Sequence, residues 1–406
     1  MSEPQPSRVV FLPPLAPEKL AYALARYSRS ADPVEDSLAW VDEHSEERFW
    51  ETFYFDYGHA SIADLGHVAA CFEGLSELAA IEVLDEQLWD GQARSTRYQD
   101  FSTTGQVTPP ELEGHALESA YRERVEEMVA TYLEVHDAAR GWLEKEHPRP
   151  DDMKKGPYRR NIAARAFDVA RGFLPLAIPT SVGQVTSIRT LEKQISRLLA
   201  SPLREVQELG EALTEGCRTE TYGGGKPPAP TLARHARRDA FAVELRERAV
   251  ELVNELAADV AEPPREERTG LVRRRSAPVE LLTGLLYEAS RLTWDSLADR
   301  VEDLGPERRG ELIADLLGRR GPHDEMPRGA RAGHLFVYEI VMDVGGFRDM
   351  HRHRRCHQHL QEYDLDAACS LPPLAEEIGL VDRCREEHAK SVALAREIAT
   401  AFSPRV

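Results

Sequence analysis

The pattern of apolar residues between Pro109 and His147 constrains the fold of this chain more than any other feature. From Leu112 to Val135, leucine, valine and tyrosine recur at helical spacing, with charged residues between them. This spacing puts the apolar side chains on one face of a long amphipathic helix. Similar patterns over Arg160–Leu174 and Val185–Leu199 predict two further helices, so we expect a chain rich in helix.

Two short segments have the composition of β-strands. Leu65–Phe72 is apolar, and Leu335–Val341 alternates aromatic and branched residues with others. Stretches rich in proline, glycine or charge, Gly223–Pro230 and Glu262–Pro278, predict connectors on either side of a helix from about Leu232 to Ala261. Together these patterns predict an α+β protein with a domain boundary near Gly223.

Composition limits what the chain can bind. Its 406 residues include 51 Lys and Arg against 70 Asp and Glu, and the net charge of −19 disfavours tracking along a nucleic acid. No apolar run is long enough to span a membrane, and the start of the chain lacks signal-peptide features, so we expect a cytoplasmic protein without membrane partners. The five cysteines are scattered and lack a CxxC pair, which argues against a disulfide framework or a thiolate zinc site.

Two distant segments share one local order: a strand-like apolar run, a glycine, and a helical run that ends in arginine-bearing polar sequence. The first begins at His67 and reads HVAACFEGLSELAAIEVLDEQLWDGQARSTRYQDF. The second begins at His334 and reads HLFVYEIVMDVGGFRDMHRHRRCHQHLQEYD. This order indicates an internal duplication whose copies have diverged.

The arginines of these segments indicate an anion-binding site. Planar guanidinium groups bind phosphate oxygens through paired, charge-assisted hydrogen bonds, and Arg94, Arg97, Arg352 and Arg354 fit that task. A fixed cation also stabilises negative charge that develops on a carbonyl of a pyrimidine or a flavin, without a protein nucleophile.

Two other interpretations of the second segment stay open. His353, Cys356 and His357 fall within one helical turn and form a candidate metal site, although the adjacent arginines repel a divalent cation. The run also fits a solvated helix, as charge runs commonly do.

The region from Gly58 to Tyr98 resembles the signature of the flavin-dependent thymidylate synthases. The family pattern runs from GHxSxxEH through a strand and EGxSR to RHRxxSxNExSxRY, and Asp64 stands for its first acidic residue. The positions that this chain keeps are Gly58, His59, Ser61, Glu73, Gly74, Ser76, Ser95, Arg97 and Tyr98.

The departures from the pattern differ between the two segments. In the first, Asp85, Glu86 and Gln87 stand where the family has RHR, and Glu77 follows Ser76 where the family has arginine. In the second, RHR stands as Arg352 to Arg354, whereas SxRY has become LQEY at Leu360–Tyr363.

The resemblance implies two tandem thymidylate-synthase-like repeats that form a pseudo-dimer. We expect a first repeat at 1–222, a linker and connecting helix at 223–278, and a shortened second repeat at 279–406. Family active sites form between subunits, so one intact copy of each motif would suffice, with one flavin for the two repeats. A homodimer of the whole chain is the expected assembly.

The resemblance also implies roles for individual residues and ligands. Arg97 and Ser95 are the expected catalytic residues, with Ser95 orienting a ring. FAD is the expected cofactor, with NADPH and methylenetetrahydrofolate as candidate co-substrates and a pyrimidine nucleotide as the candidate substrate. The residues expected at the cofactor are Arg352, His353, Arg354, Arg348, His59 and Ser61. The residues expected at the substrate are Arg94, Arg97, Tyr98, Gln92 and Arg189.

Each of these local motifs also has a structural interpretation. Ser95 to Tyr98 fits an alternating strand, His59 and Ser61 fit a helix-capping turn, and Arg189 fits a surface position. Three functions follow: thymidylate synthesis, flavin chemistry on a changed substrate, or a relative without catalysis. Gln207, at the place of a family arginine, favours the changed substrate because it supplies only neutral hydrogen bonds.

Overall fold

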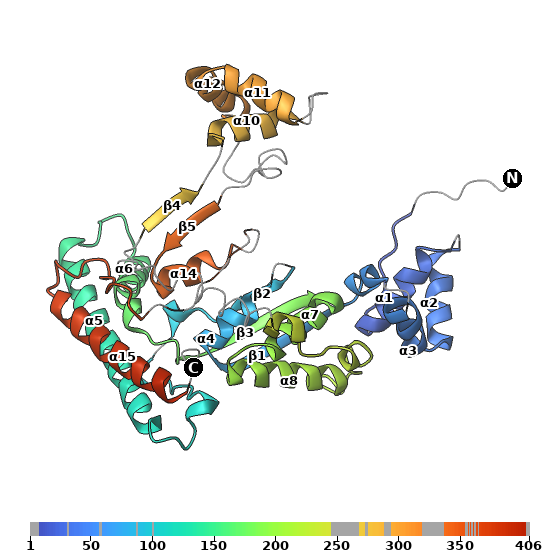
Figure 1. Ribbon diagram of the computed structural model, residues 1–406, viewed down its shortest axis with the longest axis horizontal. Coiled ribbons are helices and arrows are strands. Elements are labelled where there is room, and N and C mark those ends of the chain that lie inside the picture. Colours follow the sequence, from blue (N-terminus) through green and yellow to red (C-terminus); the bar gives the residue numbers. More distant parts are fainter. Residues whose placement is uncertain are drawn as a thin grey trace. The chain divides into compact units, whose positions relative to one another are not determined.

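The computed structural model shows an α+β protein (Figure 1). It describes residues 8–30, 32–56, 59–86, 88–99, 101–244, 268–272, 275–287, 294–318, 337–353, 356, 358, 360, 363 and 365–402. The α-helices are α1 (Pro17–Tyr27), α2 (Val34–Glu43), α3 (Glu46–Phe49), α4 (Glu77–Leu84), α5 (Glu118–Glu146), α6 (Lys155–Ala170), α7 (Ile188–Leu199), α8 (Arg204–Arg218), α10 (Ala277–Tyr287), α11 (Trp294–Asp303), α12 (Pro306–Leu317), α14 (Val344–Met350) and α15 (Val381–Ala401). The strands are β1 (His67–Ser76), β2 (Asp90–Ala93), β3 (Pro179–Ser187), β4 (Arg268–Val272) and β5 (Val337–Val341). The other helical turns are η1 (Trp50–Asp56), η2 (Ala60–Asp64), η3 (Thr96–Tyr98), η4 (Pro110–Leu112), η5 (Arg171–Phe173) and η6 (Leu232–Arg234).

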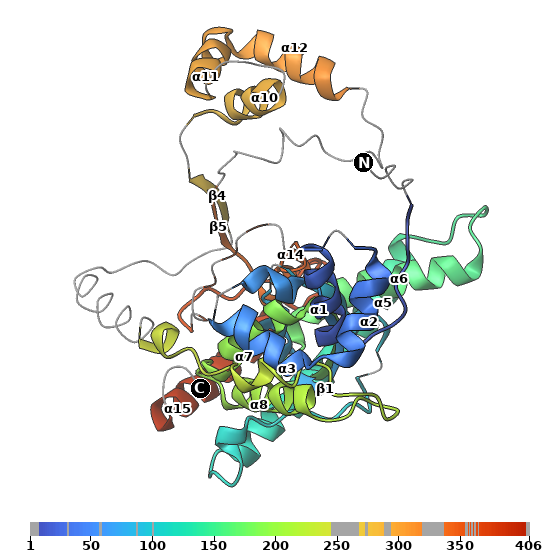
Figure 2. The same cartoon turned by 90° about the vertical axis from the view of Figure 1, so that its right-hand side faces the viewer.

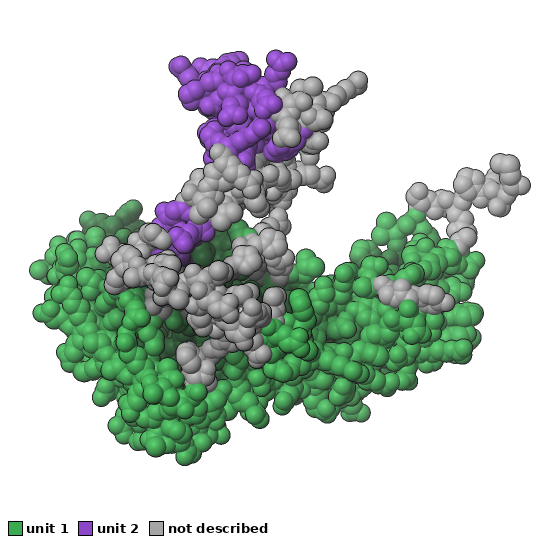
Figure 3. All heavy atoms as spheres, viewed as in Figure 1, with its two compact units in different colours: residues 1–264, 344–406 green, residues 265–343 purple. Residues whose placement is uncertain are grey.

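The chain divides into two compact units, residues 1–264 with 344–406 and residues 265–343 (Figure 3). The second unit contains the antiparallel pair β4 and β5 and a small cluster of α10, α11 and α12, which lie together in Figure 2. Arg268 lies opposite Val341 in that pair, so the strands that begin and end this unit run side by side. The larger unit holds all the residues discussed below as a site.

The larger unit is built on an antiparallel sheet in the order β1-β3-β2. His67 lies opposite Ser187 and Glu73 opposite Ser181, while β2 pairs with Val182–Val185 on the other side of β3. Gly91 has no room for a side chain, because a Cβ there would lie 2.2 Å from the Gly183 carbonyl oxygen. Apolar residues of α4, α7 and α8 pack against this sheet.

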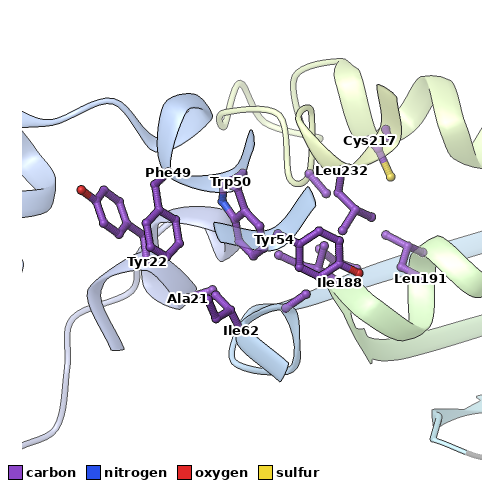
Figure 4. Packing of buried hydrophobic residues seen from close by; sticks show 14 of the residues in the cluster. Ala21, Tyr22, Phe49, Trp50, Tyr54, Ile62, Ile188, Leu191, Cys217 and Leu232 are labelled. Carbon is purple, nitrogen blue, oxygen red and sulfur yellow. The ribbon is translucent and has the colours of Figure 1, made fainter. Parts of the chain in front are cut away.

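Two further apolar clusters complete the larger unit. One joins α1, η1, α7 and η6, where Tyr22 stacks on Phe49 at 4.0 Å between ring centroids and Trp50 is fully buried (Figure 4). The other joins α5, α6 and the start of α15. A buried ion pair between Arg124 and Glu387 adds to the contact of α5 with α15.

The long helix predicted over Pro109–His147 is confirmed from Glu118 to Glu146 as α5, but its start is wrong, because the 3-10 turn η4 and further turns precede Glu118. The predicted strands correspond to β1 and β5. The helix predicted from Val185 is wrong at its start, because residues 185–187 belong to β3, the middle strand of the sheet. Burial alternates along β3 because successive side chains point to opposite faces of the sheet. Its central place comes from pairing with both β1 and β2, which a pattern in a single sequence does not reveal.

The segment after α8 also differs from expectation. Leu232–Arg234 is a short 3-10 turn, residues 240–244 are helical, and the rest of the predicted helix lies outside the described residues. Ala229 and Leu232 are fully buried in the apolar cluster of α1, η1, α7 and η6, so the segment Gly223–Pro230 folds back onto the larger unit. The boundary expected near Gly223 therefore falls inside one compact unit. The assignment of the chain to two repeats stays a prediction.

Among the described residues, no helix has the length and apolar character that a membrane span requires.

Candidate functional site

A row of alternating charges joins the two distant motif segments within the larger unit. Arg97, in η3, places Nη2 2.6 Å from Oδ1 of Asp168 near the end of α6. Arg171, one helical turn later, lies 3.8 Å from the same carboxylate oxygen and 2.7 Å from Oδ2 of Asp349 in α14. Four side chains from three separate parts of the sequence therefore form one continuous network.

A second ion pair also ties α14 to the sheet. Arg348 donates from Nη2 to Oε1 of Glu77 at 2.7 Å, and the Glu77 side chain is only 4% exposed. Glu77 is the first residue of α4, and Ser76 caps that helix by accepting from the Ala79 amide. Glu77 stands where the family pattern has arginine, and its charge is met by an arginine of the second segment.

Burial shapes the electrostatics of this network. Removal from water raises the pKa of Glu77, and the charges of Arg348 and Arg352 offset part of that rise. Burial likewise lowers the pKa of Arg348. At Asp349 burial opposes ionisation, but the hydrogen bond and charge of Arg171, with Arg97 and Arg352, outweigh it and hold the pKa below its ordinary value.

Arg352 differs from Arg348 in its surroundings. It lies in the exposed turn after α14, and its charge acts on Glu77, Arg348 and Asp349. Within the described part of the chain, no hydrogen bond or ion pair engages its guanidinium. Arg348 serves an internal ion pair, whereas Arg352 presents its charge to solvent beside the network.

The other residues of this segment expected at the cofactor or at a metal are only partly described. His353 and the metal candidate Cys356 are exposed, while Arg354 and the metal candidate His357 lie outside the described residues. The described part of the chain holds no group of three or more histidine, cysteine or carboxylate residues arranged for a metal ion.

The segment around Arg97 forms a turn and is not a regular strand. Gln92 is exposed at the edge of β2, and the Arg94 amide donates to the Ser181 carbonyl at 2.8 Å. Ser95 precedes η3, and its carbonyl accepts from Nε2 of Gln99 at 3.1 Å. The backbone of Tyr98 lies in η3, but its side chain is outside the description.

Three predicted site residues gather elsewhere, at the opposite end of β3. Arg189 pairs with Asp64 at 2.9 Å, and Nδ1 of His59 lies 3.3 Å from Nη2 of Arg29. Ser61 is exposed in η2, the turn that also contains Asp64. This group adjoins Ser187, whereas Arg94 adjoins Ser181, a separation of about 20 Å at the rise of an extended strand. The structure thus does not bring Arg189, His59 and Ser61 to Arg97.

Gln207, at the place of a family arginine, has a structural role. Its Nε2 donates to the Ser201 carbonyl at 2.7 Å, just beyond the end of α7. The side chain therefore satisfies a backbone acceptor between two helices.

A pocket of about 310 Å³ opens beside Arg97, between η3, α5 and α6. Its lining includes Arg97, Gln99, Phe101, Tyr132, His136 and Phe167. The Arg97 guanidinium lies 5.9 Å from the centroid of the Phe167 ring, within the range of a cation–π contact.

The sequence alone missed Asp168, Arg171 and this pocket. Asp168 and Arg171 lie in a stretch that the pattern predicted as helix, and charges at a helix end are ordinary surface features. The pocket residues matched core positions of two amphipathic helices. No local signal connects these residues with Arg97, because their proximity arises only when α5 and α6 pack beside η3.

Comparisons with known proteins agree with the sequence motifs. A family model described as thymidylate synthase complementing protein matches residues 14–221. A UPF0159 protein of Chlamydia muridarum (strain MoPn / Nigg) is 25% identical over 365 residues, which cover 87% of this chain and 68% of the relative. A UPF0159 protein of Chlamydia pneumoniae is 25% identical over 343 residues, which cover 79% of this chain and 62% of the relative.

Among solved structures, the flavin-dependent thymidylate synthase ThyX from Helicobacter pylori, complexed with FAD and dUMP, is similar to this chain. The match has 15% sequence identity and a TM-score of 0.31, and it covers 49% of this chain and 88% of that one.

Proposed function

Since the chain belongs to the thymidylate synthase complementing protein family, we propose that it is a flavin-dependent enzyme acting on a small planar substrate. The network between Arg97 and α14 is the observation that carries this proposal. It joins the retained SxRY motif of the first segment to the residues just before the retained RHR motif of the second. A site assembled from these two motifs would need this proximity.

The ion pair of Glu77 with Arg348 supports the idea of a fused pseudo-dimer. In the first segment an acidic residue replaces the arginine of the family pattern, and an arginine of the second segment reaches it at 2.7 Å. A charge reversal matched across two copies is what divergence after duplication would leave. We propose one flavin for each chain, with two tandem repeats sharing a single site.

Arg352 fits a flavin nucleotide in charge and exposure. A pyrophosphate needs cations that are accessible and not already neutralised, and the exposed Arg352 meets that condition better than the buried, paired Arg348. We propose that Arg352, with His353 and Arg354, holds the cofactor anion and that Arg348 anchors α14. A bound flavin would supply hydride-transfer chemistry, with NADPH as the proposed reductant.

Arg97 would act on the substrate side. Its guanidinium is fixed by Asp168 and by contact with the Phe167 ring, so it offers an oriented cation where negative charge develops on a substrate carbonyl. Ser95 remains the proposed residue for orienting a ring. Arg189, His59 and Ser61 lie near Ser187, which is about 20 Å along β3 from Ser181 beside Arg94. We therefore propose that they do not contact the substrate group that Arg97 binds.

A changed substrate is favoured over deoxyuridine monophosphate. Gln207 is engaged with the Ser201 carbonyl, and Arg97 already pairs with Asp168. A phosphate dianion near Arg97 would therefore compete with Asp168 for that guanidinium. We expect weak nucleotide binding, because an unpaired phosphate charge costs several kcal/mol.

Flavin titration tests the cofactor part of the proposal. The double variant Arg352→Ala with Arg354→Ala should lose FAD binding while its circular dichroism spectrum stays unchanged. The matched control is Arg385→Ala, an exposed arginine of α15. Equal FAD affinity of the double variant and the control would refute the assignment.

An activity assay separates the two catalytic hypotheses. Purified protein is incubated with FAD, NADPH, methylenetetrahydrofolate and deoxyuridine monophosphate. We expect a flavin spectrum without efficient thymidylate formation. Brisk formation of thymidylate would restore the function of the family's flavin-dependent synthases, and absence of any bound flavin would favour a relative without catalysis.

A further inference from the structure

The pocket beside Arg97 has three aromatic walls. Phe101 follows η3, Tyr132 lies in α5 and Phe167 in α6, and their exposed fractions are only 2%, 4% and 4%. Phe101 meets Tyr132 edge to face at a centroid distance of 5.5 Å, and Tyr132 meets Phe167 in the same manner at 6.4 Å. All three side chains are thus almost completely buried in one apolar cluster.

The remaining lining of the pocket combines the apolar Leu133 and Ala163 with the polar Arg97, Gln99 and His136. Arg97 contributes a guanidinium whose charge is balanced by Asp168 at 2.6 Å. His136 lies one turn after Tyr132 on α5, with its ring centroid 5.9 Å from that of Tyr132. Its side chain is 23% exposed, and Nδ1 lies 3.8 Å from the Asp137 carboxylate. The lining thus combines aromatic and aliphatic side chains with a guanidinium, an imidazole and an amide.

We propose that this pocket binds a planar aromatic or heteroaromatic ring that carries one negative charge, such as an aromatic carboxylate. Aromatic walls favour flat rings through stacked and edge contacts, and a volume near 310 Å³ lies at the small end of ligand pockets. Arg97 and His136 supply donors for one anionic group. The statement that this ligand is the substrate rests on the proposed function, but binding of the ligand to the pocket does not require a flavin.

The balance of charge favours a monoanion over a phosphate dianion. Asp168 offsets Arg97, so His136 is the remaining basic group of the described lining. A monoanion brings one negative charge to a lining whose guanidinium already pairs with a carboxylate. A phosphate dianion brings two, and burying more uncompensated charge is less favourable.

Calorimetric titration of the full-length chain without added flavin tests the proposal. The probe is nicotinate, a planar aromatic carboxylate. Its comparators are nicotinamide, which lacks the charge, cyclohexanecarboxylate, which lacks the flat ring, and deoxyuridine monophosphate. We expect nicotinate to bind about ten-fold more tightly than each comparator, equivalent to about 1.4 kcal/mol.

Two variants locate the binding site. His136→Gln and Phe167→Leu should each weaken nicotinate binding about five-fold or more, since each removes one recognition element. His388→Gln, a half-buried histidine of α15, is the matched control and should leave binding unchanged. The comparison of ligands on the unaltered chain decides the proposal even if Phe167→Leu fails to fold.

The outcomes separate this inference from the proposed function. Preference for nicotinate, lost in His136→Gln, supports the pocket whether or not the protein also binds FAD. Tighter binding of deoxyuridine monophosphate, no binding of nicotinate, or equal affinity in His136→Gln and His388→Gln would each overturn it. Failure of the FAD titration alone would overturn only the proposed function.

Discussion

At the scale of single residues, Glu77 depends on one partner from a distant part of the chain. Its side chain is 4% exposed, so replacing Arg348 with methionine leaves a buried carboxylate unpaired. We expect Arg348→Met to lower the free energy of unfolding by about 3 kcal/mol in urea denaturation at pH 8. The paired change Glu77→Gln with Arg348→Met should recover most of that loss, and an equal loss in both would contradict this account.

The same pair sets a dependence on pH. Burial raises the pKa of Glu77 above its unfolded value, so folding favours the protonated form. Stability from such a group is complete below the unfolded pKa, about 4.3, and is lost as pH rises through the folded pKa. In Arg348→Met this pKa rises further. Denaturation should therefore show a smaller loss at pH 5 than at pH 8, and a larger loss at pH 5 would reverse the assigned sign.

Cysteine reactivity offers a second test at this scale. Burial raises the pKa of Cys217 to about 12, whereas Cys71 and Cys356 are exposed. Because the thiolate is the reactive form, iodoacetamide at pH 8 should modify Cys71 and Cys356 and leave Cys217 intact. Mass spectrometry of peptides checks this result. The urea-unfolded chain, in which every cysteine should react, is the control, and rapid modification of Cys217 in the folded chain would disprove its burial.

At the scale of elements, the junction of β1 with α4 is held from α8. Ser76 caps α4 by accepting from the Ala79 amide at 3.0 Å, and its own hydroxyl donates to Glu205 at 2.7 Å. Ser76→Ala removes both contacts, so we expect a loss of about 2 kcal/mol in thermal or urea unfolding. Ser45→Ala, at the exposed cap of α3, should cost at most about 1 kcal/mol. A larger loss of stability in Ser45→Ala than in Ser76→Ala would show that the hydrogen bond from Ser76 to Glu205 does not stabilise the cap of α4.

At the scale of the whole molecule, residues 265–343 form a unit inserted in a larger one. Arg268 lies directly opposite Val341 in an antiparallel pair, so the chain enters and leaves through neighbouring positions. In a deletion variant, a short glycine-rich turn joins Arg268 to Val341 and replaces residues 269–340, which include the rest of β4 and β5 and helices α10 to α12. This replacement should not strain the larger unit. We expect this deletion variant to unfold cooperatively on heating, with a melting temperature within a few degrees of that of the full chain.

In the control variant, the same glycine-rich turn replaces part of β1. This variant should not fold, because β1 contributes residues to two apolar clusters. A deletion variant that is soluble yet lacks a cooperative transition would mean that the larger unit depends on the inserted one.

Local spacing was enough to identify the family motifs and to predict the α+β class and the long helix α5. It also singled out Arg97 and Arg352 as candidate anion-binding residues. It did not reveal that β3 lies between β1 and β2, since a central strand is defined by partners that lie far away in sequence.

Which of the candidate residues lie close together follows from how distant segments pack, and no local pattern contains that information. Arg97 and α14 meet through Asp168 and Arg171, which no motif marks, while Arg189 is held by Asp64 at the other end of β3. The pocket beside Arg97 likewise exists only because α5 and α6 pack next to η3. Ion pairs and cavities depend on distances between side chains from separate segments, and those distances are fixed by packing of the whole unit rather than by local spacing.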